Sequence, residues 1–200
     1  MALHTATLAP RRVLADLLPG VRALAVAREA VLVLGGAAAV GATAQVAITI
    51  PAISPVPFVL TTLTVLLLGA AYGPARAAGA MGIYLAAGVA GMPWFSEGAS
   101  GPAIPTLGYV VGFLAAAVVV GALARRGGDR TMLRTSGLML AGTAIIYACG
   151  VPYLVLATGM SWSQGLFQGA AVFLISDLLK LLVAAVLLPG AWAAVKRFSK

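Results

Sequence analysis

The chain has 200 residues, of which 62% are hydrophobic and only 9% are charged. A soluble domain of this size carries about 25% charged residues, so the composition predicts a single-domain integral membrane protein. The net charge of +8 does not indicate nucleic-acid binding, because the basic residues stand at the ends of apolar runs and not among aromatic rings. A single cysteine, Cys149, and a single histidine, His4, argue against a disulfide, a metal site and histidine-based catalysis. We therefore expect no metal, no cofactor and no enzymatic activity.

The first 29 residues predict a cytoplasmic segment that carries a short amphipathic helix. Leucines recur at helical spacing within 12–28, and Asp16 and Arg22 interrupt the run, which argues against a signal peptide. We expect this helix to lie on the cytoplasmic surface of the membrane. A plain cytoplasmic helix is the alternative.

Six apolar segments follow, separated by prolines, glycines and charges. The first is long enough to cross a hydrocarbon core of about 30 Å, whereas the second and third are short and must tilt or lie in a thinned bilayer. We predict membrane-spanning helices at 30–50, 58–72, 77–91, 106–124, 135–157 and 168–188. The chain would then be an all-α membrane protein with a segment 1–29, a six-helix domain 30–190 and a basic tail 191–200.

The positions of the basic residues predict the orientation in the membrane. If the N-terminus is inside, six successive spans place the connections alternately outside and inside. The inside segments then hold twelve of the 13 Lys and Arg residues. The thirteenth, Lys180, lies in the sixth span, and the three outer loops carry one charge, Glu97. Because basic residues accumulate on the cytoplasmic side, both termini are expected there.

Asp177 and Lys180 are two charges inside the sixth apolar segment. A charge within the bilayer costs roughly 2.5–3.5 kcal/mol, so such residues need a partner or a polar site. Their spacing places them on one face of a helix, with the acid nearer the N-terminus. At about 1.5 Å per residue, Asp177 would lie about 14 Å from the outer end of the span at Gln168. A ligand or ion site is the main interpretation, and a structural ion pair is the alternative.

The first span is rich in small residues. Ala38 and Ala42, four residues apart, would allow another helix to approach closely. No phosphate-binding loop occurs, so ATP-driven uptake would need another subunit as its motor.

Five motifs follow one another along the chain: PVPF at 55–58, LGAAYGP at 68–74, YLAAGVAGMPWF at 84–95, TLGYVVGF at 106–113 and DLLK at 177–180. In this order they resemble the BioY family, the biotin-specific substrate-binding components of energy-coupling-factor (ECF) transporters. The resemblance covers about residues 30 to 190. The chain departs from the family pattern at 57–62, PFVLTT, where a glutamine is usual, and it contains no asparagine.

The resemblance implies a six-helix bundle in the bacterial plasma membrane that binds biotin near its outer side. It implies that Asp177 and Lys180 contact the vitamin and that the loop after the third span closes over it. The Ala38/Ala42 region would dock to a transmembrane coupling protein, which works with a pair of ATPases.

Three aromatic residues, Trp94, Phe95 and Tyr109, are candidates for the apolar wall of the site. The alternative is an aromatic belt at the membrane interface. For the whole chain, the alternatives are a binding component for a different vitamin or a self-sufficient membrane carrier.

Overall fold

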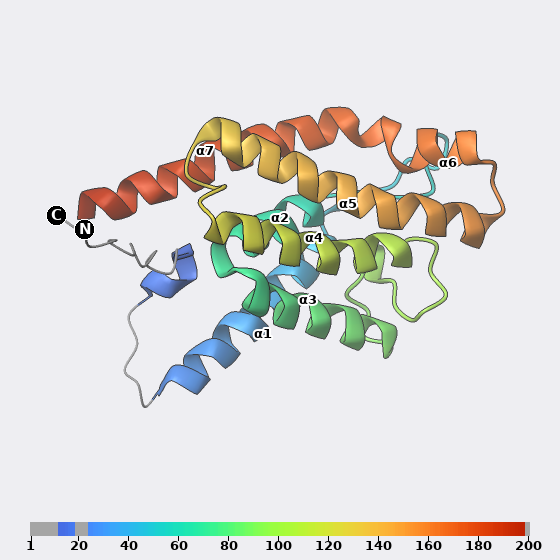
Figure 1. The fold of residues 1–200 in the computed structure, drawn as a ribbon. Coiled ribbons are helices and arrows are strands. Elements are labelled where there is room, and N and C mark those ends of the chain that lie inside the picture. Colours follow the sequence, from blue (N-terminus) through green and yellow to red (C-terminus); the bar gives the residue numbers. More distant parts are fainter. Residues whose placement is uncertain (1–11, 19–23, 199–200) are drawn as a thin grey trace, which may run out of the picture.

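The computed structural model describes residues 12–18 and 24–198 and is almost entirely helical (Figure 1). The long helices are α1 (Ala25–Ala44), α2 (Thr61–Tyr72), α3 (Pro74–Val89), α4 (Leu107–Arg125), α5 (Met132–Thr158) and α7 (Leu174–Phe198). The shorter elements are η1 (Leu14–Leu17), β1 (Ala47–Ile48), β2 (Phe58–Val59), η3 (Ser96–Gly98), α6 (Trp162–Gly169) and η4 (Ala171–Phe173). The two strands form one antiparallel pair in the connection between α1 and α2.

Helix α4 lies in the middle of the bundle. It packs against α2, α3 and α5, while α1 packs against α3 and α7 packs against α5 (Figure 1). Glycines allow this close approach, because a Cβ at Gly69 of α2 would lie 2.7 Å from the carbonyl oxygen of Ala117. A Cβ at Gly121 of α4 would lie 2.7 Å from the backbone at Gly73 and Pro74. Small residues of this kind replace the bulky core of a soluble protein, because membrane helices associate through close packing.

Each of the six predicted apolar segments overlaps one long helix, which confirms the helical membrane class. Within the described residues, four helical segments are long and apolar enough to cross a membrane: α1, α4, α5 and the run from α6 through α7. Helices α2 and α3, with 12 and 16 residues, are shorter, as the sequence predicts.

Two boundaries differ from the prediction. Helix α1 begins at Ala25 and ends at Ala44, so residues 45–50 leave the helix and include β1. Helix α7 begins at Leu174 instead of Gln168 and continues through Pro189 to Phe198. A proline near the end of a helix removes one backbone donor, and here the surrounding turns keep the helix intact.

The predicted amphipathic helix over 12–28 is wrong as a single element. Residues 14–17 form a 3₁₀ turn, Leu18 is extended (ψ 130°), and residues from Ala25 onward belong to α1. Leu18 precedes a proline, which disfavours helical geometry at that residue. The part of the predicted helix at 19–23 lies outside the described residues.

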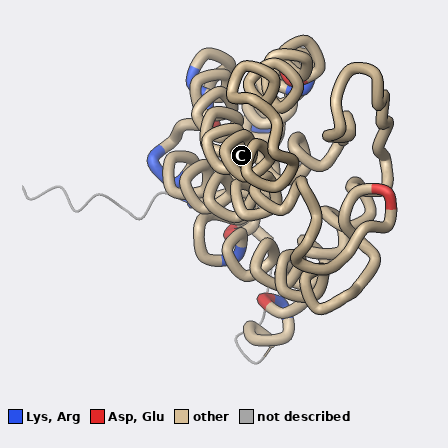
Figure 2. The backbone as a smooth tube through the Cα atoms, turned by 90° about the vertical axis from the view of Figure 1, so that its right-hand side faces the viewer, with Lys and Arg blue, Asp and Glu red and all other residues tan. Residues whose placement is uncertain are grey.

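The basic residues of the described chain gather at one end of the bundle, except Lys180. This end holds the start of α1, the α2–α3 turn, the α4–α5 turn and the end of α7, on the left in Figure 1. Outside this end, the charged residues of the described chain are Glu97, Asp177 and Lys180, and most of the tube in Figure 2 is uncharged. The clustering agrees with the alternation deduced from the sequence.

A cluster of ion pairs joins η1 to α1 and α3 at this basic end. The Arg76 guanidinium lies 2.7 Å from the carboxylate of Asp16 and 2.5 Å from that of Glu29. Burial alone would raise the pKa of Asp16, but hydrogen bonds from Arg76 and from the backbone N–H of Val13 outweigh it and lower that pKa. The ionised form of Asp16 therefore stabilises the contact between η1 and α3.

Candidate functional site

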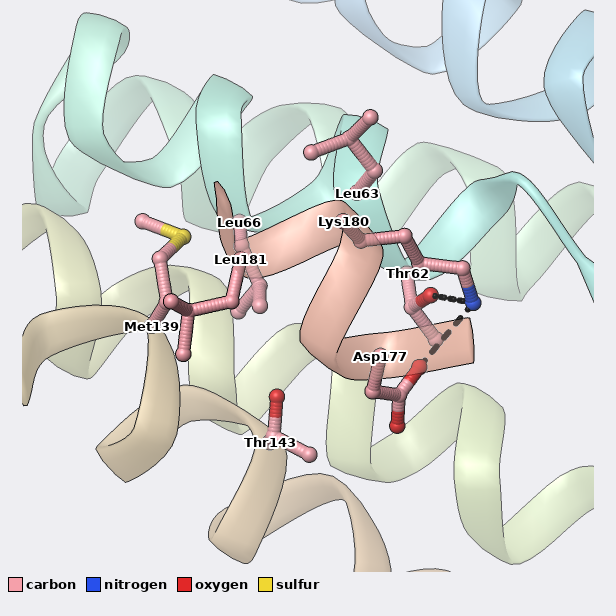
Figure 3. Close-up of a pocket in the computed structure, with 8 residues that line it drawn as sticks. All are labelled: Thr62, Leu63, Leu66, Met139, Thr143, Asp177, Lys180 and Leu181. Carbon is pink, nitrogen blue, oxygen red and sulfur yellow. Dashed lines mark hydrogen bonds and ion pairs between the residues drawn. The ribbon is translucent and has the colours of Figure 1, made fainter. Parts of the chain in front are cut away.

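The Asp177–Lys180 ion pair lies in the first two turns of α7. The Lys180 ammonium donates to Asp177 Oδ1 at 3.0 Å and to the hydroxyl of Thr62 in α2 at 2.8 Å (Figure 3). The other carboxylate oxygen, Asp177 Oδ2, accepts a hydrogen bond from the Tyr147 hydroxyl of α5. The two charged side chains are 12% and 17% exposed, respectively. The pair is therefore shielded and joined to two neighbouring helices.

The position of the pair along its helix differs from the prediction, because the helix begins later. Asp177 lies in the first turn of α7 and not about nine residues inside one continuous helix. There the partial positive charge of the helix N-terminus also favours the carboxylate, typically by 0.3–1 kcal/mol.

The late start of α7 has a cause in the tertiary structure. The helical geometry is interrupted at Ala170 (φ −140°, ψ −56°), between α6 and η4. Breaking a helix leaves backbone carbonyls without partners. Here the carbonyl of Gln168 accepts from the Ser54 hydroxyl, and that of Gly169 accepts from the Tyr109 hydroxyl, both at 2.7 Å. Side chains from two other segments thus stabilise the helix interruption that places Asp177 in the first turn of α7.

The charged pair lines a small cavity between α2, α5 and α7, which we call the charged cavity. Its other described lining residues are Thr62, Leu63, Leu66, Met139, Thr143 and Leu181 (Figure 3). Its volume is about 10 Å³, which is room for about one water molecule. A ligand the size of a vitamin would have to displace side chains to occupy it.

Two further hollows are linked to the charged cavity through shared lining residues. An aromatic cavity of about 30 Å³ is lined by Tyr84, Phe95, Tyr109 and Phe113, among others. An open hollow of about 210 Å³ lies beside β1, β2 and α7. Val59 lines both the aromatic cavity and the open hollow, and Lys180 lines both the open hollow and the charged cavity. The open hollow therefore shares one lining residue with each of the other two cavities.

The structure brings Phe95 and Tyr109 together as two walls of the aromatic cavity. Each also has a packing role, because the Phe95 ring is 1% exposed and occupies the space that a side chain at Gly88 would need. The Tyr109 ring meets the Tyr147 ring edge-on at 6.5 Å, and Tyr147 in turn reaches Asp177. Tyr109 and Asp177 are thus linked through one intervening side chain.

Trp94 lines none of the three hollows among the residues described for them. Its indole Nε1 donates to the carbonyl of Tyr84 at 2.9 Å. The Gln45 amide at the end of α1 donates to the carbonyls of Trp94 and Phe95, both at 3.1 Å. These contacts fasten the α3–α4 loop to α1 and α3, so Trp94 is placed as an anchor of that loop.

Two residues of the site were missed by sequence reasoning. Tyr147 lies in the middle of α5, and Thr62 lies in the first turn of α2. For Thr62 a signal was available, because it ends the stretch in which the chain departs from the family pattern. For Tyr147 the only signal was a polar hydroxyl within an apolar span.

The predicted docking residues Ala38 and Ala42 are both exposed, on the outer face of α1. Gly35 is exposed on the same face, and a Cβ there would have no neighbour within 4 Å. The face is therefore small and open, as a helix–helix contact requires.

Comparison with known proteins defines the class. The fold matches the crystal structure of the S-component for biotin from an ECF-type ABC transporter, with a TM-score of 0.74 at 18% identity, covering 86% of this chain and 93% of that one. This chain has the fold of a membrane-embedded S-component.

The sequence comparisons then define the family. The profile of the BioY family matches residues 13–197. The biotin transporter BioY of Rhizobium etli is 34% identical over 143 residues, which cover 66% of this chain and 76% of that protein. The biotin transporter BioY of Thermotoga maritima is 34% identical over 143 residues, covering 70% and 82%. The chain belongs to the BioY family.

Proposed function

We propose that this protein is the membrane-embedded biotin-binding component of an ECF transporter in a bacterial plasma membrane. The observation that carries the proposal is the shielded Asp177–Lys180 pair, placed beside an aromatic cavity in a chain of the BioY family. Its homologues are transporters and not enzymes, which agrees with a binding role.

The chemistry of biotin suits these side chains. Its ureido ring carries two N–H donors and one carbonyl acceptor, its thioether ring is apolar, and its tail is a carboxylate. Asp177 would accept from a ureido N–H, and Lys180 would donate to the ureido carbonyl or to the carboxylate. Phe95 and Tyr109 would pack against the apolar ring, and Trp94 would hold the loop over it.

Binding would proceed by exchange of hydrogen bonds within the charged cavity. Because the cavity has room for about one water, biotin would replace the Tyr147 hydroxyl on Asp177 or the Thr62 hydroxyl on Lys180. Each lost contact would be replaced by one to the ligand, so the charges would never be left without partners. Such exchange favours a ligand with both donors and acceptors over an apolar one.

The decisive experiment is calorimetric titration of the purified chain in detergent with biotin, thiamine and riboflavin. We expect binding of biotin alone, and failure to bind biotin would refute the proposal. Biotin methyl ester then identifies the partner of Lys180. If Lys180 meets the carboxylate, Lys180→Met should bind the acid and the ester equally, whereas the wild type should prefer the acid.

We further propose that six helices, α1 to α5 and α7, span the bilayer with both termini in the cytoplasm. The basic end of the bundle would then face the cytoplasm, and the connection containing β1 and β2 would face outside. The segments 1–29 and 191–200 would be cytoplasmic. Labelling of single cysteines placed in the α3–α4 loop and in the α4–α5 turn would test this orientation in intact cells.

The transmembrane coupling protein, with its pair of ATPases, would dock on the small-residue face of α1. Ala42→Trp should therefore reduce co-purification with the coupling protein and leave biotin binding intact. Ala193→Trp, at an exposed alanine of α7, is the matched control and should reduce neither. Biotin uptake by proteoliposomes that contain this chain and no ATPase would instead indicate a self-sufficient carrier.

A further inference from the structure

A fourth cavity, at the basic end of the bundle, lies between the end of α4 and the start of α5. Its volume is about 480 Å³, and it is lined by Leu123, Arg126, Gly127, Gly128, Arg134, Gly137 and Leu138. Two arginines, Arg126 just after α4 and Arg134 in α5, thus border one hollow large enough for a small ligand. None of the hollows of the biotin region shares a described lining residue with it.

The described lining residues of this cavity carry a net positive charge. Among its described lining residues none is acidic. The acidic residue of the neighbouring turn, Asp129, is fully buried and accepts hydrogen bonds from the Trp192 indole at 2.6 Å and from Arg130 at 3.2 Å. Its carboxylate is therefore used within the fold and does not line the hollow beside Arg126 and Arg134.

The same hollow opens onto an apolar face of α5. Leu133, Gly137 and Leu140 follow each other at spacings of four and three residues, so they lie on one side of the helix. Leu133 is 85% exposed and Leu140 is 60% exposed. An anionic group in the hollow would therefore have exposed hydrocarbon surface directly beside it, and lipids combine these two properties in one molecule.

We infer that this cavity binds the phosphate of an anionic membrane lipid, with Arg126 and Arg134 at the headgroup and the acyl chains along Leu133 and Leu140. Guanidinium groups pair with phosphate oxygens through charge-assisted hydrogen bonds. Basic pockets between helices at the cytoplasmic side of a membrane are suited to such headgroups. The site is separate from biotin binding and does not depend on it.

The test uses the full chain purified in detergent and titrated with short-chain phosphatidylglycerol or phosphatidylcholine with the same acyl chains, followed by native mass spectrometry. Phosphatidylglycerol should bind more tightly. Arg134→Gln should weaken its binding about fivefold, the contribution expected from one cation beside an anionic lipid. The matched control Arg197→Gln removes an exposed arginine of α7 at the same end and should change binding less than twofold.

A second variant tests the cavity and not only the charge. A Cβ at Gly137 meets no neighbour within 4 Å, so Gly137→Phe should fit the helix and fill the hollow while keeping both arginines. It should also weaken phosphatidylglycerol binding, and retained biotin affinity would show that both variants are folded. Equal binding of the two lipids, or equal losses in Arg134→Gln and Arg197→Gln, would overturn the inference. Displacement of the lipid by inorganic phosphate would also overturn it, because it would assign the site to a soluble anion.

Discussion

The Asp177–Lys180 pair allows a double-mutant cycle that separates a structural role from ligand binding. The variants are Asp177→Asn, Lys180→Met and the two combined. Asparagine keeps an oxygen that can accept from Tyr147, and methionine keeps the length of the lysine stem, so each change removes mainly a charge. The combined variant has neither charge.

The expected stabilities follow from the burial of the pair. Each single variant leaves one charge, 12% or 17% exposed, without its 3.0 Å partner. Breaking a buried ion pair in this way costs about 3–5 kcal/mol, whereas removing both charges is often close to neutral. We therefore expect both single variants to have a much lower free energy of unfolding in detergent than the wild type. The combined variant should lie within about 1 kcal/mol of the wild type.

The expected affinities follow a different pattern. If the pair binds biotin, the combined variant should lose at least about 1.5 kcal/mol of binding free energy, roughly tenfold in affinity, because no charge-assisted hydrogen bond remains. Calorimetric titration with biotin measures this loss directly. A combined variant that is stable and binds biotin within twofold of the wild type would refute the site, because the pair would then be a structural ion pair alone.

Three other predictions concern contacts outside the charged cavity. Asp16→Asn should lower stability at pH 7 by about 1 kcal/mol. Arg76 lowers the pKa of Asp16, so the stabilisation is present above the ordinary pKa of 3.8 and is lost as the pH falls through the lowered pKa. The thermal unfolding midpoints of the wild type and the variant should therefore converge in acid. A difference that stays constant with pH would contradict the role of the ionised Asp16 carboxylate. Trp192→Phe should cost about 1–3 kcal/mol, because buried Asp129 loses its 2.6 Å donor, and an unchanged unfolding midpoint would argue against that bond. Gln45→Ala should speed amide exchange in the α3–α4 loop roughly fivefold or more, while exchange in α4 stays unchanged as the internal control.

Much of the architecture was predictable because it depends on local properties. Hydropathy alone places each of the six long helices, and the spacing of Asp177 and Lys180 alone predicts their contact. The predicted helix at 12–28 failed for a local reason as well, since Pro19 follows Leu18. The restriction that Pro19 places on Leu18 is enough to predict that a helix ends before Leu18.

The remaining features depend on contacts between distant residues. The sequence near Ala170 contains no proline, and the helix breaks there because Ser54 and Tyr109 satisfy the freed carbonyls. Tyr147 and Thr62 are 30 and 118 residues from the charges that they contact. Such contacts follow from how the helices pack, and a single sequence does not specify that packing.

The short helices α2 and α3 have a consequence for the bilayer as an elastic medium. At about 1.5 Å per residue they are about 18 and 24 Å long, against a hydrocarbon thickness of about 30 Å. Where α3 faces the lipid, beside α1, the leaflets are expected to compress, at a cost of fractions of a kcal/mol for each ångström of mismatch. A protein that covers this flank would release that deformation energy. We therefore expect association with the coupling protein through α1 to strengthen in lipids of increasing chain length, because the membrane itself would then favour the assembled transporter.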